Sequence, residues 1–208
     1  MAHARQQVGI LSDSAALAFY RDHRNEYEAE ARAIAGTNGT VSRAGGRLTI
    51  RVSHGKPLVF VDTLAEGDQH HRYLYKSWMQ DLGVHDVESW FYEGGVHLVV
   101  FGKTGHVTII PDRPISSPDK QRFAVASEDL EAGYDPNRLE IWRVSARGLT
   151  REFVLDGGRA WGPRDLEWLS PSLIRYSRTS LSAAGAQRSV VRWLRLVNGE
   201  WHAISKFP

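Results

Sequence analysis

Apolar and polar residues follow two different periods along this chain, and the first is helical. Between residues 12 and 36, apolar side chains recur at alternating spacings of three and four, in a stripe interrupted by Arg24. Ser12, Asp13 and Ser14 offer oxygens for an N-cap, and Gly36 can supply a left-handed stop. The pattern therefore predicts one N-terminal helix on the surface of a sheet.

From residue 37 onward the period changes to two, which is typical of strands with one buried face. The predicted strands cover residues 40–42, 48–52, 57–62, 72–78, 87–92, 96–101, 106–110, 122–127, 139–144, 150–155, 165–169, 173–178, 190–197 and 200–204. Short strands at this spacing, separated by Gly, Pro and Asn, favour sheet stacking. The predicted fold class is mainly β, with stacked antiparallel sheets and the one N-terminal helix.

One stretch of the second half carries a family resemblance. Residues 115–144 read ISSPDKQRFAVASEDLEAGYDPNRLEIWRV. The segment resembles the SPDGK-x-(I/F)-A blade motif of the WD40-like propeller repeats, often seen in exported bacterial proteins, although Lys120 stands where glycine is usual. A weaker echo follows at 161–179, and 102–114 looks like the outer hairpin of a preceding unit. The resemblance covers roughly 95–204 and brings no catalytic residues with it.

The resemblance implies an open or partial propeller-like fold. Propellers typically close with about 4–8 blades, and two or three blades cannot close a ring. Either the chain is an open stack capped by its N-terminal half, or several copies assemble into a homo-oligomer. The exposed edge of such a stack needs protection by the helix or by another subunit.

Length and composition fit a globular chain. The chain has 208 residues, 42% hydrophobic and 24% charged, which excludes disorder as the main state. We expect residues 1–11 to be disordered and 12–208 to form a single β-rich domain. Within it the helix covers 12–36, the first sheets 37–110 and the blade-like sheets 111–208.

Charge and cysteine content limit the kinds of partner and metal site that the chain can have. The formal net charge of +2 does not build the strong field that drives nucleic-acid binding, so no nucleic-acid partner is predicted. No apolar run approaches the ~18–20 residues that span a bilayer. The absence of cysteine excludes disulfides and thiolate metal sites. The opening residues 1–4 resemble the end of a signal peptide, which favours a periplasmic or secreted protein over a cytoplasmic one.

Histidines suggest a metal site, but their spacing argues against one. Five of the nine histidines fall between residues 70 and 106. The neighbours His70 and His71 point to opposite faces of a strand. In the hairpin that follows, His106 pairs with Phe101, which places His97 ~13 Å away along the same face at ~3.3 Å per residue. No metal site is therefore predicted.

The acidic loop over 127–140 is a candidate ligand site. Glu128, Asp129 and Asp135 are hard oxygen ligands of the kind that calcium accepts. Their spacing, however, does not match an EF-hand loop. The alternative is a long, solvated hairpin loop.

Tryptophans supply the remaining candidate. Seven are present, and stacked indoles bind sugar rings or anchor protein interfaces. Most lie within apolar alternation and are expected to fill sheet cores. Trp161, between Gly158 and Pro163, is predicted to be the exposed one and a ligand-binding residue.

No catalytic motif accompanies these candidates. The chain has no G-x-S-x-G, H-E-x-x-H, P-loop or dinucleotide fingerprint, so no catalytic residue and no cofactor is predicted. We expect a non-enzymatic, exported interaction or scaffold protein that binds another protein or a cell-envelope component. The alternative is a carbohydrate or small-ligand binding protein, or a hydrolase, that uses surface tryptophans and carboxylates. A third interpretation is an inhibitor or immunity-type protein.

Overall fold

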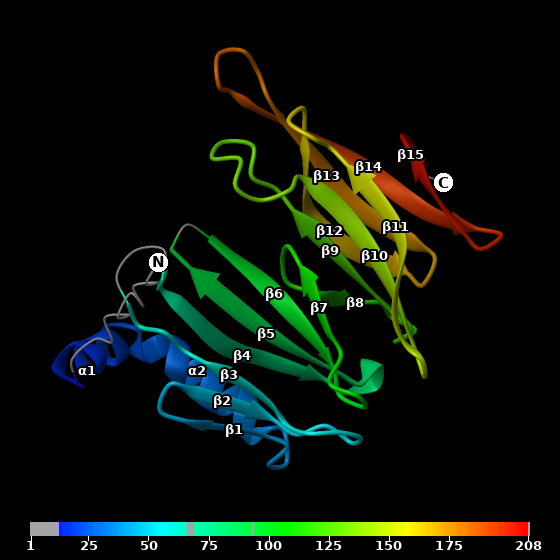
Figure 1. Ribbon diagram of the computed structural model, residues 1–208. Helices are drawn as coiled ribbons and strands as arrows, with labels where there is room; N and C mark the ends of the chain where they lie inside the picture. The colour runs from blue at the N-terminus through cyan, green and yellow to red at the C-terminus, as the bar shows by residue number, and fades with distance from the viewer. Residues whose placement is uncertain (1–12, 66–68, 93, 208) are drawn as a thin grey trace, which may run out of the picture. The chain divides into compact units, whose positions relative to one another are not determined.

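The computed structural model describes residues 13–65, 69–92 and 94–207, with side chains from residue 18 onward. It consists of four antiparallel sheets and two α-helices, and it is drawn in Figure 1. The prediction of a mainly β fold built from antiparallel sheets is confirmed. Within the described ranges, neither helix has the length and apolarity that crossing a membrane requires.

The chain divides into two compact units. The first unit comprises Met1–Trp78 and His85–Val107, and the second comprises Met79–Val84 and Thr108–Pro208. The expectation of a single domain over 12–208 stays a prediction.

The N-terminal helix is broken in two, so the prediction of one continuous helix is wrong. Helix α1 covers Asp13–Asp22 and helix α2 covers Arg24–Ala35. The break lies at His23, whose imidazole Nδ1 is 2.9 Å from the carbonyl of Phe19 and whose ring stacks on the Phe19 ring. The imidazole thus competes with the backbone for the carbonyl of the preceding turn.

The end of α2 also differs from the prediction. Gly36 has a φ of −72° and is right-handed, so it is not the left-handed stop. Thr37 ends the helix instead, because its hydroxyl donates to the carbonyl of Ile34 at 2.7 Å and accepts from the N–H of Val41. The predicted N-cap at Ser12, Asp13 and Ser14 lies outside the residues whose side chains are described.

The first unit contains a three-stranded sheet and most of a four-stranded sheet, which share one core. Their strand orders are β1-β2-β3 and β4-β5-β6-β7. The core holds Leu48, Ile50, Tyr75, Val87 and Val100, and α2 adds apolar side chains to it. The strands are β1 (Val41–Ala44), β2 (Arg47–Ile50), β3 (Leu58–Val61), β4 (His71–Met79), β5 (Val84–Phe91), β6 (Gly94–Phe101) and β7 (Val107–Ile110).

The second unit contains two four-stranded sheets, with orders β11-β10-β9-β8 and β12-β13-β14-β15. Their facing sides form one core that includes Leu139, Ile141, Ile174, Leu194 and Trp201. In both sheets the strands are joined in chain order. The strands are β8 (Ile115–Ser116), β9 (Arg122–Ser127), β10 (Arg138–Ser145), β11 (Gly148–Asp156), β12 (Gly162–Ser170), β13 (Leu173–Leu181), β14 (Gln187–Val197) and β15 (Glu200–Ile204).

The turn before β9 shows why glycine is usual at the position of Lys120, which follows the Ser-Pro-Asp segment. Ser117 Oγ donates to Asp119 Oδ1 at 2.6 Å, and the N–H of Lys120 donates to the carbonyl of Ser117 at 3.0 Å. Lys120 has a φ of +57°, a left-handed conformation that glycine adopts without strain. The position therefore requires the backbone conformation that a glycine favours, although a lysine occupies it.

Candidate functional site

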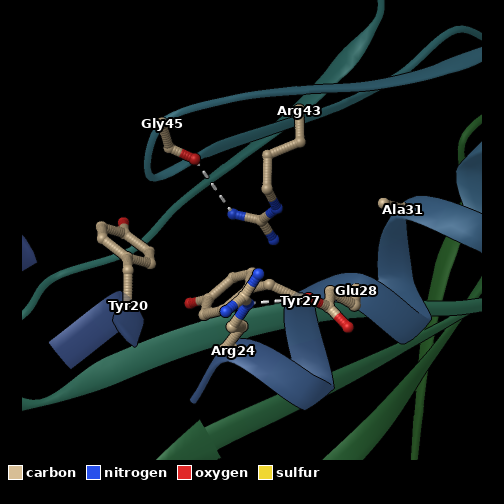
Figure 2. A pocket seen from close by; sticks show the side chains of 7 residues that line it. All are labelled: Tyr20, Arg24, Tyr27, Glu28, Ala31, Arg43 and Gly45. Carbon is tan, nitrogen blue, oxygen red and sulfur yellow. Dashed lines mark hydrogen bonds and ion pairs between the residues drawn. The ribbon is translucent and has the colours of Figure 1, made fainter. Parts of the chain in front are cut away.

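A pocket of about 400 Å³ opens in the first unit between the two helices and the turn that joins β1 to β2. Figure 2 shows its lining side chains. The lining residues are Tyr20, Arg24, Tyr27, Glu28, Ala31, Arg43 and Gly45.

The helices supply one wall of the pocket. Tyr20, Arg24, Tyr27 and Ala31 follow one another at spacings of four, three and four, so they share one helical face in spite of the break at His23. The two tyrosine rings meet edge to face with their centroids 5.0 Å apart. The stripe that predicted packing on a sheet thus also lines a cavity.

A charged pair forms the rim of this wall. Arg24 Nε donates to Glu28 Oε1 at 2.8 Å, and both side chains are at least half exposed. An exposed pair one helical turn apart contributes only ~0.3–0.5 kcal/mol to stability. Its guanidinium and carboxylate therefore stay available to a ligand at low energetic cost.

Arg43, which lines the pocket, belongs to a buried cluster of three charges with Glu30 and Asp62. Arg43 Nε lies 2.5 Å from one oxygen of Glu30, and Arg43 Nη1 lies 3.0 Å from Asp62 Oδ2. The side chains of Glu30 and Asp62 are only 2% and 1% exposed. The guanidinium also lies 5.5 Å from the centroid of the Tyr27 ring, in position for a cation–π contact.

The same three charges hold the edge of β4. The N–H of Tyr75 donates to Glu30 at 2.7 Å, and the N–H of Tyr73 donates to Asp62 at 2.9 Å. Arg43 donates to the carbonyl of Tyr73. Side chains thus occupy backbone groups that would otherwise pair with another strand, which is one way of protecting a sheet edge.

Burial and charge set the protonation of the cluster. Burial raises the pKa of Asp62, against the lowering effect of the Tyr73 N–H and of Arg43. Burial alone would lower the pKa of Arg43, but its contacts with Glu30 and Asp62 outweigh it, and that pKa is raised. Burial, reinforced by the charge of Asp62, also raises the pKa of Tyr20 and Tyr27. Both phenols are therefore neutral hydrogen-bond donors at physiological pH.

The pocket can bind a small, polar ring. It offers two aromatic rings, a guanidinium and a carboxylate at the rim, and neutral phenols. The hydroxyl of Tyr27 is buried and has no hydrogen-bond partner among the described side chains. A buried donor without a partner is costly to stability.

The prediction that Trp161 is exposed is wrong. It is only 8% exposed and belongs to the core of the second unit, where it contacts Tyr176. The guanidinium of Arg178 lies 4.8 Å from the ring centroid of Trp161. The glycine–proline context that suggested an exposed loop instead reflects close packing, because a Cβ at Gly157 would lie 1.9 Å from the carbonyl oxygen of Trp161.

The acidic candidates lie near one another, but two of them bind parts of their own unit. Glu128 is paired with Arg164. The carboxylate of Asp129 accepts backbone N–H bonds from Ala132, Tyr134 and Asp135, and these bonds lower its pKa. Burial and the charge of Asp129 raise the pKa of Asp135. The arrangement organises the loop, while ligand binding by these residues stays a prediction.

The histidines form pairs with other side chains rather than one cluster. His71 Nε2 lies 2.6 Å from the hydroxyl of Ser89, and His97 Nδ1 lies 2.6 Å from Asp86 Oδ1. The predicted pairing of Phe101 with His106 is confirmed by a 2.9 Å backbone hydrogen bond. In the described part of the chain, no three His, Asp or Glu side chains are grouped so that they could hold a metal ion.

Sequence reasoning missed the pocket and the buried charge cluster that Arg43 forms with Glu30 and Asp62. Glu30, Arg43 and Asp62 lie 13 and 19 residues apart along the chain, so no local period connects them. The only sequence signal for the pocket was Arg24, the polar residue that interrupts the helical stripe.

Comparisons with known proteins add nothing to this geometry, because no family model, no curated protein and no solved structure matches the chain.

Proposed function

We propose that this protein is a non-enzymatic binding protein. A small polar ligand would occupy the pocket lined by Tyr20, Tyr27 and Arg24, which we call the tyrosine–arginine pocket. The observation that carries the proposal is the joint presence of two tyrosine rings and the Arg24–Glu28 pair around one cavity. Ligand pockets commonly measure ~300–1,000 Å³ and combine apolar walls with a few polar groups. The cavity, at about 400 Å³, lies within that range.

The lining favours a sugar ring, such as a unit of a cell-envelope glycan. The C–H face of a sugar packs on an aromatic ring, and its hydroxyls need both donors and acceptors. Tyr20 and Tyr27 offer the rings, Arg24 offers donors and Glu28 offers acceptors. This proposal keeps the carbohydrate-binding alternative expected from the sequence, with tyrosines in place of the tryptophan that proved to be buried.

A thermal-shift titration with envelope glycans tests the proposal. A ligand at ~100 times its dissociation constant stabilises the fold by ~2.7 kcal/mol. At ~2–4 °C per kcal/mol, the midpoint should rise by several degrees. Tyr20→Ala and Glu28→Gln should lose the shift. Tyr134→Ala is the matched control, because Tyr134 is an exposed tyrosine of the second unit and should keep the shift. A flat response to every glycan, or a full shift in both pocket variants, would contradict the proposal.

Protein binding is the second candidate function. Three consecutive aromatic residues at the end of β5, Trp90, Phe91 and Tyr92, are between 38% and 66% exposed. Exposed aromatic side chains commonly anchor protein interfaces.

The sheet topology supports the proposed resemblance to propeller blades. Three four-stranded sheets join their strands in chain order, as the strands of a propeller blade do.

An exported location belongs to the same proposal. Fractionation of the native host, with an antibody against this protein, should place it in the periplasm or the medium. Recovery in the cytoplasm alone would overturn the proposed location, while leaving the pocket to be tested by itself.

A further inference from the structure

One hairpin of the second unit carries positive charge with no acidic residue to balance it. Residues 168–199 contain no Asp or Glu, although the whole chain has nearly as many acidic as basic residues. The segment covers β13, β14 and the turns beside them. Its five arginines are Arg175, Arg178, Arg188, Arg192 and Arg195.

Half of β14 has a neighbouring strand on one side only. It pairs with β13 from Gln187 to Arg195, but with β15 only from Trp193 to Val197. No strand of the described residues pairs with 187–192 on the side of β15. Figure 1 shows the β13–β14 hairpin reaching beyond the end of β15. This half of the strand, which we call the β14 free edge (residues 187–192), is largely solvent-exposed.

The backbone groups on this edge can be assigned from neighbouring hydrogen bonds. The N–H of Leu196 donates to the carbonyl of Ser172 at 2.8 Å, so Leu196 directs its backbone groups toward the β13 side. Successive residues of a strand direct these groups to alternate edges. Ser189 and Val191 therefore present N–H and C=O groups outward. The guanidinium of Arg192 already donates to the carbonyl of Val191 at 2.9 Å.

On one face of the free edge, two arginines flank Val190, which is 49% exposed. Arg188 and Arg192 are four residues apart on β14 and share one face, and Arg178 lies diagonally across from both on β13. Diagonal neighbours in a sheet are ~7–8 Å apart. Neither Arg188 nor Arg192 forms an ion pair with a carboxylate of the described residues. On the opposite face, Val191 is 42% exposed.

We infer that the β14 free edge binds an extended, acidic polypeptide segment, which adds to the sheet as a further strand. Alternate acidic side chains of that segment would face Arg188 and Arg192, and the apolar side chains between them would cover Val191. Strand addition obtains affinity from the main chain and specificity from alternate side chains. A nucleic acid or an acidic glycan would match the arginines, but it has no amide backbone to pair with Ser189 and Val191. The inference rests on the second candidate function, protein binding, and is independent of the tyrosine pocket.

A labelled peptide tests the inference on the full chain. The probe is a fluorescein-labelled ten-residue peptide that alternates Glu and Val, titrated by fluorescence anisotropy. We expect saturable binding that weakens as NaCl is raised, because salt screens exposed charges. Charge reversal in Arg188→Glu/Arg192→Glu should weaken binding at least about tenfold. The matched control is Arg147→Glu/Arg159→Glu, which changes the net charge equally at two exposed arginines of the second unit and should bind like the wild type.

A second pair of variants tests the backbone contribution. Val191→Pro removes an edge N–H without touching the ladder to β13, and it should abolish peptide binding while leaving the circular dichroism spectrum unchanged. Val191→Thr keeps that N–H and should bind normally. Undiminished binding to Val191→Pro would overturn the inference. So would a DNA duplex that binds as tightly as the peptide and is insensitive to this proline. The glycan shift measured on the same variants should be unaffected, so a failure here leaves the pocket proposal untouched.

Discussion

At the scale of single residues, His85 shows how burial changes the chemistry of a side chain. It lies on β5 with its Nδ1 2.9 Å from the Tyr75 hydroxyl and its ring centroid 4.2 Å from that of Trp78. Burial lowers the pKa of His85 from 6.5 to about 4. The imidazole is therefore neutral in the folded protein at pH 5–6, whereas in the unfolded chain it is largely protonated.

This difference predicts a pH dependence of stability. Between pH 6.5 and about 4 the unfolded state binds more protons at His85, so the free energy of unfolding falls as the pH falls through this window. At ~1.36 kcal/mol per pKa unit, the loss approaches roughly 3 kcal/mol near pH 4. Urea unfolding at pH 7.5, 5.5 and 4.5 measures it, and His85→Gln should show a shallower decline. Equal slopes for the wild type and the variant would contradict the prediction.

At the scale of elements, the edge of β4 depends on a charge supplied by α2. Replacing Glu30 by alanine would leave the Tyr75 N–H without its acceptor and would remove one of the two carboxylates paired with Arg43. Removing one partner of a buried ion pair typically costs ~3–5 kcal/mol. We expect a loss of that size for Glu30→Ala in urea unfolding. Glu28 lies two residues before Glu30 and forms an exposed ion pair with Arg24. Glu28→Ala should therefore cost less than ~0.5 kcal/mol of stability. Similar losses in the two variants would show that the cluster does not hold the edge.

The bounds of some helices and strands could be predicted from the sequence, and others could not. The predicted strands 122–127 and 200–204 coincide with β9 and β15; β9 is buried along nearly its whole length, whereas β15 buries only Trp201. Strand β8 was missed, since two residues are too few to show a period. The break at His23 was also missed, because the apolar spacing continues through it and only a side-chain contact marks it.

The candidate site was less predictable, for a physical reason. The helical stripe indicated a packed face but not a cavity, since the opposing wall comes from the turn after β1. The buried charge cluster around Arg43 joins residues from α2, β1 and the segment after β3, which only tertiary structure brings together. Trp161 misled because glycine and proline beside an aromatic residue are typical both of exposed loops and of tightly packed turns.

At the scale of the whole molecule, the two units have separate cores. All the buried members of the second core lie between Ala124 and Trp201, and all those of the first lie between Val41 and Val100. Both sheets of the second unit are complete within residues 108–208. A fragment of this length is sufficient to bury its own core.

We therefore predict that a fragment covering residues 108–208 folds by itself. It should show a β-sheet circular dichroism spectrum and one cooperative urea transition, because the sheets that bury Ile141, Ile174 and Leu194 are retained. A shorter fragment that begins at residue 128 lacks β8 and β9 and should not fold, since it loses the strand that carries Ala124. If the longer fragment is also unfolded, the second core depends on the rest of the chain, and the single domain expected from the sequence becomes the better description.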